Sequence, residues 1–324
     1  MCRSFFYFLL LNFEFAMQGL VYKSTGSWYL VQVRDSDFWD ARIKGKMKID
    51  EDISSTNPIA VGDTVAFDVE DESVKTGIIT EVKDRYNYMV RVSPHNKNQK
   101  HIIAANIDLA LLVTSIAHPR TSTGFIDRFL ITAEAYHIPS IIVVNKTDLL
   151  TKKQDEVLAR WQEIYKGAGY GLFPVSAKDK KTLSELEQRL IGKTTLFSGH
   201  SGVGKSTLIN GFIPGIDIKT KVVSGWSGKG QHTTTFAEMF DLPGGGRIID
   251  TPGVKEFGLI DFEKEELSQY FPEMRAVMNA CKFNNCLHVN EPGCAVKQAV
   301  ADKAISEDRY VSYVAILESI EKKW

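Results

Sequence analysis

The sequence lacks any apolar run of about 18 residues, the length that a helix needs to cross a bilayer. Cysteine is scarce, since four cysteines in 324 residues are too few for a secreted disulfide scaffold. Neither charge is in excess, because 39 lysines and arginines face 40 aspartates and glutamates, which excludes nucleic-acid binding through bulk positive charge. Internal repeats and low-complexity tracts are also lacking. The remaining composition, 44% apolar and 24% charged, is globular, and the length predicts two or three domains.

The first sixteen residues contain a short apolar run at 5–11, preceded by the single charge of Arg3. A secretory signal begins in this way, but no small-x-small cleavage site follows, and the run is too short to span a bilayer. Met17 then opens a regular segment. We therefore expect residues 1–16 to be a disordered or misassigned leader.

Residues 17–99 hold short β-branched and aromatic segments separated by turn residues. These segments lie at 28–33, 64–69, 77–82 and 88–92. Regular short strands of this kind predict a small closed barrel. The pattern alone leaves an OB barrel and an SH3-like barrel both open.

Residues 100–262 alternate between strand and helix patterns. Strands are predicted at 107–114, 140–144, 172–175, 194–197 and 247–249, and helices at 125–136, 152–166, 182–191 and 205–212. This alternation predicts a parallel, doubly wound α/β sheet. At 263–324 the strands stop, and two helices are predicted to flank a group of cysteines. The second helix carries one apolar stripe, formed by Tyr310, Tyr313, Val314 and Leu317.

A phosphate-binding loop is predicted between a strand and a helix, as this motif requires. Its residues are Gly199, His200, Ser201, Gly202, Val203, Gly204, Lys205, Ser206 and the following Thr207. Glycines allow backbone N–H groups to surround an anion, and the helix N-terminus adds a favourable dipole. Lys205 can bridge the terminal phosphates, and Ser206 can ligate Mg²⁺.

Two further motifs follow predicted strands and can read a purine base. The first is Asn145-Lys146-Thr147-Asp148, and the second is Ser176-Ala177-Lys178. A carboxylate in the base plane accepts two hydrogen bonds from guanine, whereas adenine lacks that donor pair, so Asp148 predicts GTP. The methylenes of Lys146 can cover the ring face.

The magnesium and switch residues come last. Asp250 ends a strand, where a carboxylate can hold the Mg²⁺ shell, and Gly253 can offer its N–H to the γ-phosphate. Thr234 lies in a polar loop suited to a switch that orders around Mg²⁺. Because the base-reading motifs precede the phosphate loop, the domain is predicted to be circularly permuted. The site still assembles, since its geometry depends on strand ends and not on chain order.

From about Leu20 onward the chain closely resembles the ribosome small-subunit-dependent GTPase A family of bacterial ribosome maturation. The resemblance rests on the permuted motif order, the Gly-x-His-Thr-Thr switch and the final cysteine cluster. It implies an N-terminal OB barrel, a circularly permuted GTPase core and a C-terminal zinc domain. It also implies binding to the small ribosomal subunit late in assembly, with hydrolysis stimulated by that subunit.

The resemblance makes His232 the candidate that orients the attacking water, beside Lys205 and Thr234 as catalytic groups. Val254 follows Gly253, where many GTPases carry a water-orienting glutamine that an aliphatic chain cannot replace. A solvated loop histidine, with a ribosomal group completing the site, stays open as the alternative. Gln231 stands where the family more often shows arginine, which puts a local RNA or phosphate contact in doubt.

A metal site is predicted from Cys281, Cys286, His288 and Cys294, since three thiolates and one imidazole form a closed tetrahedral set. Inert buried cysteines or a disulfide are the alternatives, although disulfides are rare in the cytosol. The spacing matches the family, and the resemblance implies one structural Zn²⁺.

RNA contacts are predicted from two segments. Residues 85–101 carry Arg85, Arg91, Lys97 and Lys100 without an acid, and tyrosines and histidines lie among them. A solvated hairpin followed by a linker is the alternative. A second basic group comprises Lys219, Lys221 and Lys229.

The sequence therefore predicts a cytoplasmic, monomeric GTP hydrolase with Mg²⁺, GTP and GDP as ligands and no membrane partner. Its expected partner is the small ribosomal subunit with its rRNA. The predicted parts are a leader at 1–16, a barrel at 17–99, a GTPase domain at 100–262 and a zinc domain at 263–324. An RNA-binding scaffold with structural nucleotide, or a switch for a non-ribosomal partner, remain the alternatives.

Overall fold

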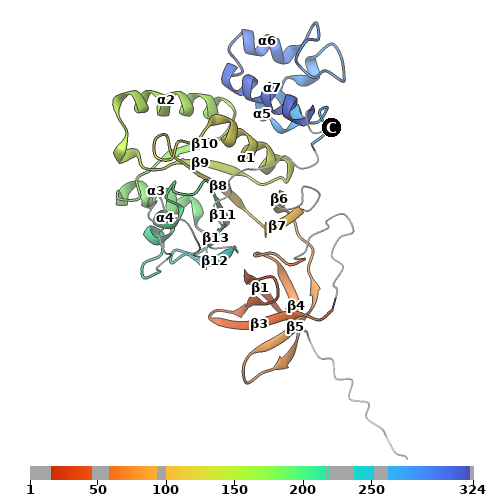
Figure 1. Ribbon diagram of the computed structural model, residues 1–324, viewed down its shortest axis with the longest axis vertical. Helices are drawn as coiled ribbons and strands as arrows, with labels where there is room; N and C mark the ends of the chain where they lie inside the picture. The colour runs from red at the N-terminus through yellow and green to blue at the C-terminus, as the bar shows by residue number, and fades with distance from the viewer. Residues whose placement is uncertain are drawn as a thin grey trace, which may run out of the picture.

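The computed structural model describes residues 16–45, 58–92, 100–216, 218, 237–251 and 262–321. Figure 1 shows three parts along the long axis: a barrel at one end, a central sheet with helices, and a group of C-terminal helices. Residues 1–15 of the expected leader lie outside the described residues. No helix in the described ranges is long and apolar enough to cross a membrane.

The N-terminal part is a closed five-stranded barrel. Its strands are β1 (Met17–Ser24), β2 (Tyr29–Arg34), β3 (Asp37–Ile43), β4 (Thr64–Asp71) and β5 (Thr76–Val82). They pair in the order β1-β2-β3-β5-β4, and β4 returns to pair with β1, which is the Greek-key closure of an OB barrel. The sequence missed β1 and β3, because polar residues interrupt their apolar alternation.

The central sheet has helices on both faces, as the sequence predicted. Its strands run in the order β10 (Gly171–Pro174), β9 (Ser140–Val144), β8 (Leu109–Thr114), β11 (Thr194–Ser198), β13 (Arg247–Asp250) and β12 (Glu238–Asp241). All neighbours are parallel except β12, which is antiparallel to β13. The helices are α1 (Thr123–Ala135), α2 (Lys152–Gly167), α3 (Lys180–Leu190) and α4 (Lys205–Phe212), with a 3-10 turn η1 (Thr147–Leu149) after β9.

Alternating residues of β8 explain the two helical layers. Ala110 and Leu112 pack in the core that α1 and α2 cover. Leu111 and Val113 pack in the opposite core, which α3 and α4 cover. Because side chains alternate along a strand, an apolar run buries both faces and leaves the strand ends free to carry polar site residues.

In the sequence, a hairpin lies between the barrel and the central sheet, although β1 of the barrel also pairs with β12. Its strands β6 (Tyr88–Val92) and β7 (Lys100–Ala105) form a separate two-stranded sheet, so the expectation that 88–92 belongs to the barrel is wrong. The placement of Arg85 on the predicted RNA face is wrong, because its side chain is 7% exposed and forms an ion pair of 2.6 Å with buried Asp63. Lys97 lies outside the described residues, and the second basic group, Lys219, Lys221 and Lys229, does too.

The C-terminal part is helical. It contains η2 (Leu267–Tyr270), α5 (Pro272–Arg275), η3 (Met278–Ala280), α6 (Ala295–Ala301) and α7 (Glu307–Glu321). Both longer helices follow the cysteine cluster, and short turns replace the helix predicted before it. The apolar stripe of α7 packs inward, with Tyr313 fully buried. Ile131 of α1 joins this core, so the C-terminal helices pack directly on the GTPase part.

Candidate functional site: a nucleotide cradle and a metal centre

The phosphate loop depends on two glycines that accept close contacts. Gly199 has φ +143°, and a Cβ there would lie 2.2 Å from the carbonyl oxygen of Val113. Gly204 has φ +99°, and its Cβ would lie 2.3 Å from Asn145 Nδ2. Any side chain would therefore displace either β8 or the base-reading motif. Glycine at these positions brings the loop against two neighbouring strand ends.

Lys205 begins α4 and is buried beneath the phosphate loop. Its Nζ donates to the carbonyl oxygens of Gly199, at 2.6 Å, and His200, at 3.1 Å. Burial lowers the pKa of Lys205, and the nearby charge of Asp250 opposes that shift. The next residue, Ser206, is half-buried in the first turn of α4, whereas Ser201 and Thr207 are exposed.

The first base-reading motif contacts the phosphate loop directly. Asn145 Nδ2 donates to the carbonyl oxygen of Val203 at 2.9 Å, and Lys146 Nζ donates to that of Gly202 at 2.7 Å. Asn145 Oδ1 is buried without a hydrogen-bond partner in the described structure. Burial lowers the pKa of Lys146. These contacts place the two predicted subsites side by side.

The second base-reading motif supports Asp148. Ser176 Oγ donates to Asp148 Oδ1 at 2.8 Å, and Lys178 Nζ lies 3.2 Å from Oδ2. The Ser176 hydrogen bond is the main reason that the pKa of Asp148 is lowered, and Lys178 adds to it. Asp148 is therefore held ionised, which is the form that accepts two hydrogen bonds from a base edge. Ala177 lies between Ser176 and Lys178 on the same turn.

Asp250 ends β13 beside the phosphate loop. Its Oδ1 is buried and has no hydrogen-bond partner among the described residues. Burial raises the pKa of Asp250 to about 6, Lys205 opposes the rise, and the charge of Glu238 adds to it. A buried carboxylate oxygen without a partner suits a hard cation such as Mg²⁺. Gly253, Val254, Gln231, His232 and Thr234 lie outside the described residues.

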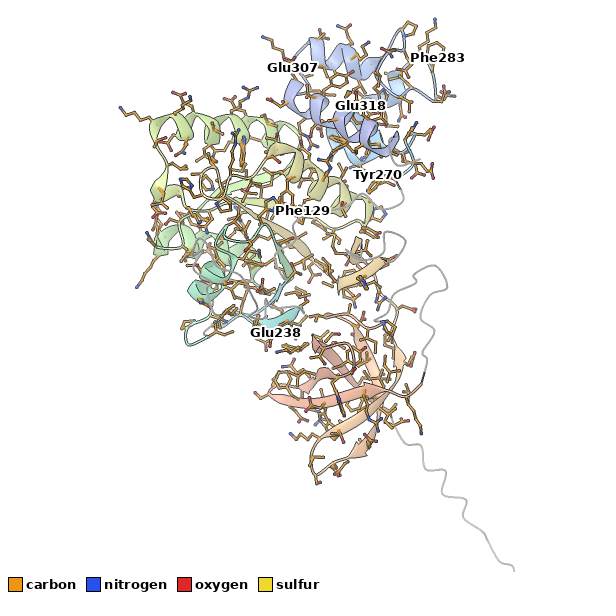
Figure 2. All side chains as sticks on the ribbon, viewed as in Figure 1. Phe129, Glu238, Tyr270, Phe283, Glu307 and Glu318 are labelled. Carbon is orange, nitrogen blue, oxygen red and sulfur yellow. The ribbon has the colours of Figure 1, made fainter. Side chains whose placement is uncertain are left out.

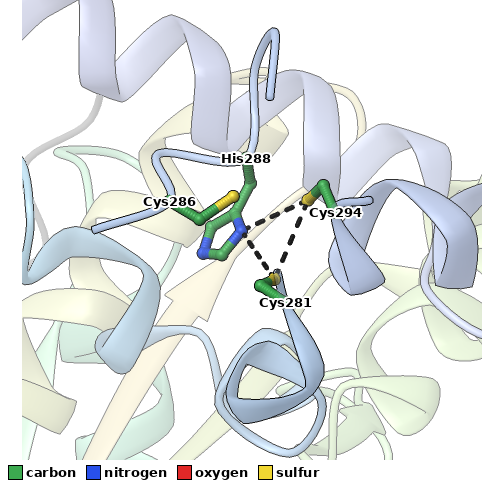
Figure 3. Close-up of side chains that lie close together, drawn as sticks. All are labelled: Cys281, Cys286, His288 and Cys294. Atoms are coloured by element: carbon green, nitrogen blue, oxygen red, sulfur yellow. Dashed lines mark hydrogen bonds between the residues drawn. The ribbon is translucent and has the colours of Figure 1, made fainter. Parts of the chain in front are cut away.

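The cysteine cluster converges on one point, as Figure 3 shows. Cys281, Cys286, His288 and Cys294 place their ligand atoms within 4.8 Å of one another. His288 Nδ1 lies 3.6 Å from Cys281 Sγ and 3.4 Å from Cys294 Sγ, and these sulfurs are 4.0 Å apart. Tetrahedral ligands about 2.3 Å from one ion are about 3.7 Å apart, so the set fits Zn²⁺. A disulfide between these sulfurs is excluded, since it needs about 2.05 Å.

Sequence reasoning missed the groups that hold the loop of the Cys/His cluster. Glu291 accepts backbone N–H bonds from Leu287 and Val289, each at 2.9 Å, and from Asn290 at 3.0 Å. Tyr310 donates its hydroxyl hydrogen to the carbonyl oxygen of His288 at 2.7 Å. An acid between two predicted ligands, and a tyrosine on the apolar face of α7, were the available signals.

A buried ion cluster joins α7 to α1, and sequence reasoning missed it also. Arg309 Nη1 lies 2.6 Å from Asp127 Oδ1, and Arg309 Nε lies 2.7 Å from Glu273 Oε1. Arg309 and Asp127 are each 1% exposed. The guanidinium also lies 4.5 Å from the ring centroid of Phe271. The part that carries the Cys/His cluster is thus fixed to the helix that follows β8.

Two family models match the chain. One, described as RsgA GTPase, matches residues 82–260, and the other, described as RsgA N-terminal domain, matches residues 18–79. The first covers more than half of the 324 residues. The chain belongs to the RsgA GTPase family. The resemblance found in the sequence is confirmed.

Curated RsgA relatives match over nearly the whole chain. The small ribosomal subunit biogenesis GTPase RsgA of Christiangramia forsetii is 48% identical over 309 residues, 95% of this chain and 98% of that protein. The protein of the same name from Flavobacterium psychrophilum is 51% identical, covering 95% of this chain and 94% of its own length.

Two solved structures share the RsgA fold of this chain. YjeQ from Thermotoga maritima has a TM-score of 0.74 and 32% identity, covering 94% of this chain and 98% of its own. YloQ, described as a circularly permuted GTPase, has a TM-score of 0.72 and 31% identity, covering 97% of this chain and 98% of its own. This RsgA family member is therefore a circularly permuted GTPase with an N-terminal barrel and a C-terminal Cys/His cluster able to hold a metal ion.

Proposed function

We propose that this chain binds and hydrolyses GTP with Mg²⁺ and uses that cycle in the biogenesis of the small ribosomal subunit. The observation that carries the nucleotide part is the contact of Asn145 and Lys146 with carbonyl oxygens of the phosphate loop. A base-reading motif and a phosphate cradle share one edge of one sheet. A single nucleotide can occupy both subsites there.

The phosphates lie in the proposed site against the loop formed by Gly199, His200, Ser201, Gly202, Val203, Gly204, Lys205, Ser206 and Thr207. Backbone N–H groups and the α4 N-terminus stabilise the negative charge. Without nucleotide, Lys205 pairs with two carbonyl oxygens, because burial makes an unpaired ammonium costly. In the proposed complex, phosphate oxygens replace these partners. Gly253 is proposed to add an N–H to the γ-phosphate.

Asp148 reads the guanine edge, while Asn145, Lys146, Ser176, Ala177 and Lys178 shape its surroundings. Ser206, Asp250 and Thr234 are the proposed Mg²⁺ ligands, directly or through water. When bound, Mg²⁺ neutralises charge that develops on the phosphates. Lys205, Thr234 and His232 are the proposed catalytic groups, and His232 orients the attacking water.

The Cys/His cluster is proposed to hold one structural Zn²⁺. Cys281, Cys286, His288 and Cys294 would fill the four positions of a tetrahedral site, which would leave none open for a substrate. Backbone N–H groups of Ala295 and Lys297 point at the sulfurs of Cys281 and Cys294, at 3.3 and 3.4 Å. Such donors stabilise thiolates, the form that binds the metal.

The small ribosomal subunit and its rRNA are proposed as the partner, because the relatives with this full-length arrangement are named for that subunit's biogenesis. We infer a cytoplasmic monomer organised as an N-terminal part at 17–99 that contains the barrel, a GTPase domain at 100–262 and a zinc domain at 263–324. The subunit is proposed to stimulate hydrolysis late in its own maturation.

Co-sedimentation with purified ribosomal subunits tests the partner. The chain with a non-hydrolysable GTP analogue should pellet with small subunits and not with large ones, and GDP should weaken this binding. Lys205→Ala should lose the difference between the two nucleotides, because it removes the contact to the terminal phosphates. Equal pelleting with both subunits, or none with either, contradicts the proposal.

A further inference from the structure

Three charged residues form a row across the junction of the barrel and the central sheet. In the pairing of β1 with β12, Lys23 lies opposite Glu238. In the pairing of β12 with β13, Glu238 lies opposite Asp250. Residues directly opposite each other in antiparallel pairs project from the same face, so all three side chains share one side of the sheet. Figure 2 labels Glu238 where the two parts meet.

The charges along this row are positive, negative and negative, and the barrel contributes the positive end. Lys23 Nζ lies 3.0 Å from Glu238 Oε1, and both side chains are partly exposed. Within the ranges that the structure describes, this is the ion pair that Glu238 makes. Asp250 comes next in the row, followed by Lys205 of the phosphate loop, whose charge acts on Asp250. Without Lys23, the Glu238 carboxylate beside Asp250 at the proposed Mg²⁺ position would lose the cation that pairs with it.

The seam around the row is held by side chains of both parts. Tyr22, next to Lys23, donates its hydroxyl hydrogen to Asp241 Oδ1 at 2.6 Å and accepts from Arg247 Nε at 3.0 Å. Asp241 and Arg247 end β12 and begin β13. The position of β1 therefore determines whether Lys23 reaches Glu238.

We propose that Lys23 and Glu238 are positioning residues for the magnesium–nucleotide site, with Lys23 of the barrel neutralising Glu238 and so setting the negative charge beside Asp250. This inference rests on the proposed function, in which Asp250 holds Mg²⁺. It makes the barrel an electrostatic part of the GTPase site. A partner that displaced β1 on binding would change the balance between metal and phosphate binding without moving a catalytic residue.

The sign of each effect follows from the charges. Removing Lys23 leaves Glu238 uncompensated, which repels nucleotide phosphates and attracts Mg²⁺. GDP then binds more weakly without Mg²⁺, and the strengthening that Mg²⁺ brings becomes larger. Removing the charge of Glu238 has the opposite effect on both quantities. One unit charge added or removed near a partly exposed site predicts changes of about threefold to tenfold.

The experiment measures GDP affinity by calorimetry in excess Mg²⁺ and in excess EDTA, on the full chain. Lys23→Met should lower affinity in EDTA and raise the Mg²⁺-dependent gain, and Glu238→Gln should do the reverse. The double variant should return near the unmodified chain, and Lys23→Arg should keep its values. Lys75→Met is the matched control, since Lys75 pairs with Asp37 on the barrel surface away from the site. It should change neither quantity.

The outcomes separate this inference from the proposed function. If the pair only holds the seam together, both single variants shift GDP affinity in the same direction, which overturns the inference. Unchanged values in both variants overturn it as well. Asp250→Asn is measured in parallel, and if it leaves the Mg²⁺-dependent gain intact, the proposed Mg²⁺ site itself is wrong. A loss of that gain in Asp250→Asn, with opposite shifts in the two single variants, supports both.

Discussion

Asn145 donates its side-chain amide hydrogen to the carbonyl oxygen of Val203 at 2.9 Å, although the two residues are 58 positions apart. This bond ties the base-reading motif at the end of β9 to the phosphate loop at the end of β11. The strand between them, β8, pairs in parallel with both. Parallel pairing brings the strand ends to one edge, so the permuted chain order leaves the cradle intact.

The first prediction concerns base selection by Asp148. Asp148→Asn should weaken binding of GDP by at least about tenfold, because the carboxylate loses both charge and one acceptor facing guanine. Xanthosine diphosphate should gain affinity, since its ring carbonyl accepts from the new amide. Competition titrations of the two nucleotides measure the switch. Asp155→Asn, an exposed aspartate on α2, is the control and should change nothing.

The second prediction concerns pH and Mg²⁺. Burial, with the charge of Glu238, raises the pKa of Asp250 to about 6, and the ionised form is the one that ligates a metal. Below about pH 6, protons therefore compete with Mg²⁺, and the Mg²⁺ concentration for half-maximal GDP binding should rise roughly tenfold per pH unit. Above that pH it should level off.

GDP itself titrates near this range, so the comparison needs a variant. Asp250→Asn, measured under the same conditions, keeps the titration of the nucleotide and loses that of the carboxyl group. The Mg²⁺ concentration for half-maximal GDP binding should depend more steeply on pH in the unmodified chain than in Asp250→Asn. Equal slopes in the two chains would contradict the assignment of Asp250.

The third prediction concerns the metal. Cys294→Ser should reduce bound zinc well below one per chain, as measured by elemental analysis, because it removes one thiolate ligand. Stringent chelation of the unmodified chain should lower the melting temperature of the C-terminal part, since binding energy in a structural site is folding energy. Cys2→Ser is the control, because Cys2 lies outside the described residues and outside the cluster. This variant should keep the full zinc content. An unchanged melt after complete metal removal argues against a structural role.

The fourth prediction concerns the Arg309 cluster. Arg309→Met leaves buried Asp127 and Glu273 without their cation, so the free energy of unfolding should fall by about 3–5 kcal/mol. Arg160→Met is the matched control, because Arg160 pairs with Asp308 on the exposed side of the same junction. It should cost less than about 1 kcal/mol. Chemical denaturation measures both, and similar losses would contradict the importance of the buried cluster.

Local sequence patterns predicted several elements closely. Strand β9 and helix α4 begin and end at the predicted residues. An uninterrupted apolar run determines the first, and the phosphate-loop lysine marks the start of the second. The convergence of Asn145 and Lys146 with the phosphate loop also followed from strand ends alone. Their proposed roles in nucleotide binding stay predictions.

The rest depended on partners distant in sequence. Strand β12 is four residues long with acids at both ends, and it is a strand because it pairs with β13 and β1. Arg85 and Arg309 carry charges that a sequence assigns to the surface, whereas acids from other elements neutralise them in the interior. Hydrophobicity patterns do not predict such pairings, because the partners lie far apart in the sequence.

GTP turnover with and without purified small ribosomal subunits tests the central claim most directly. We expect slow turnover by the chain alone, strong stimulation by small subunits, and loss of both in Lys205→Ala. Turnover that subunits leave unchanged would support a switch for another partner. No turnover under either condition would support an RNA-binding scaffold, and would contradict a GTPase that acts on the small subunit.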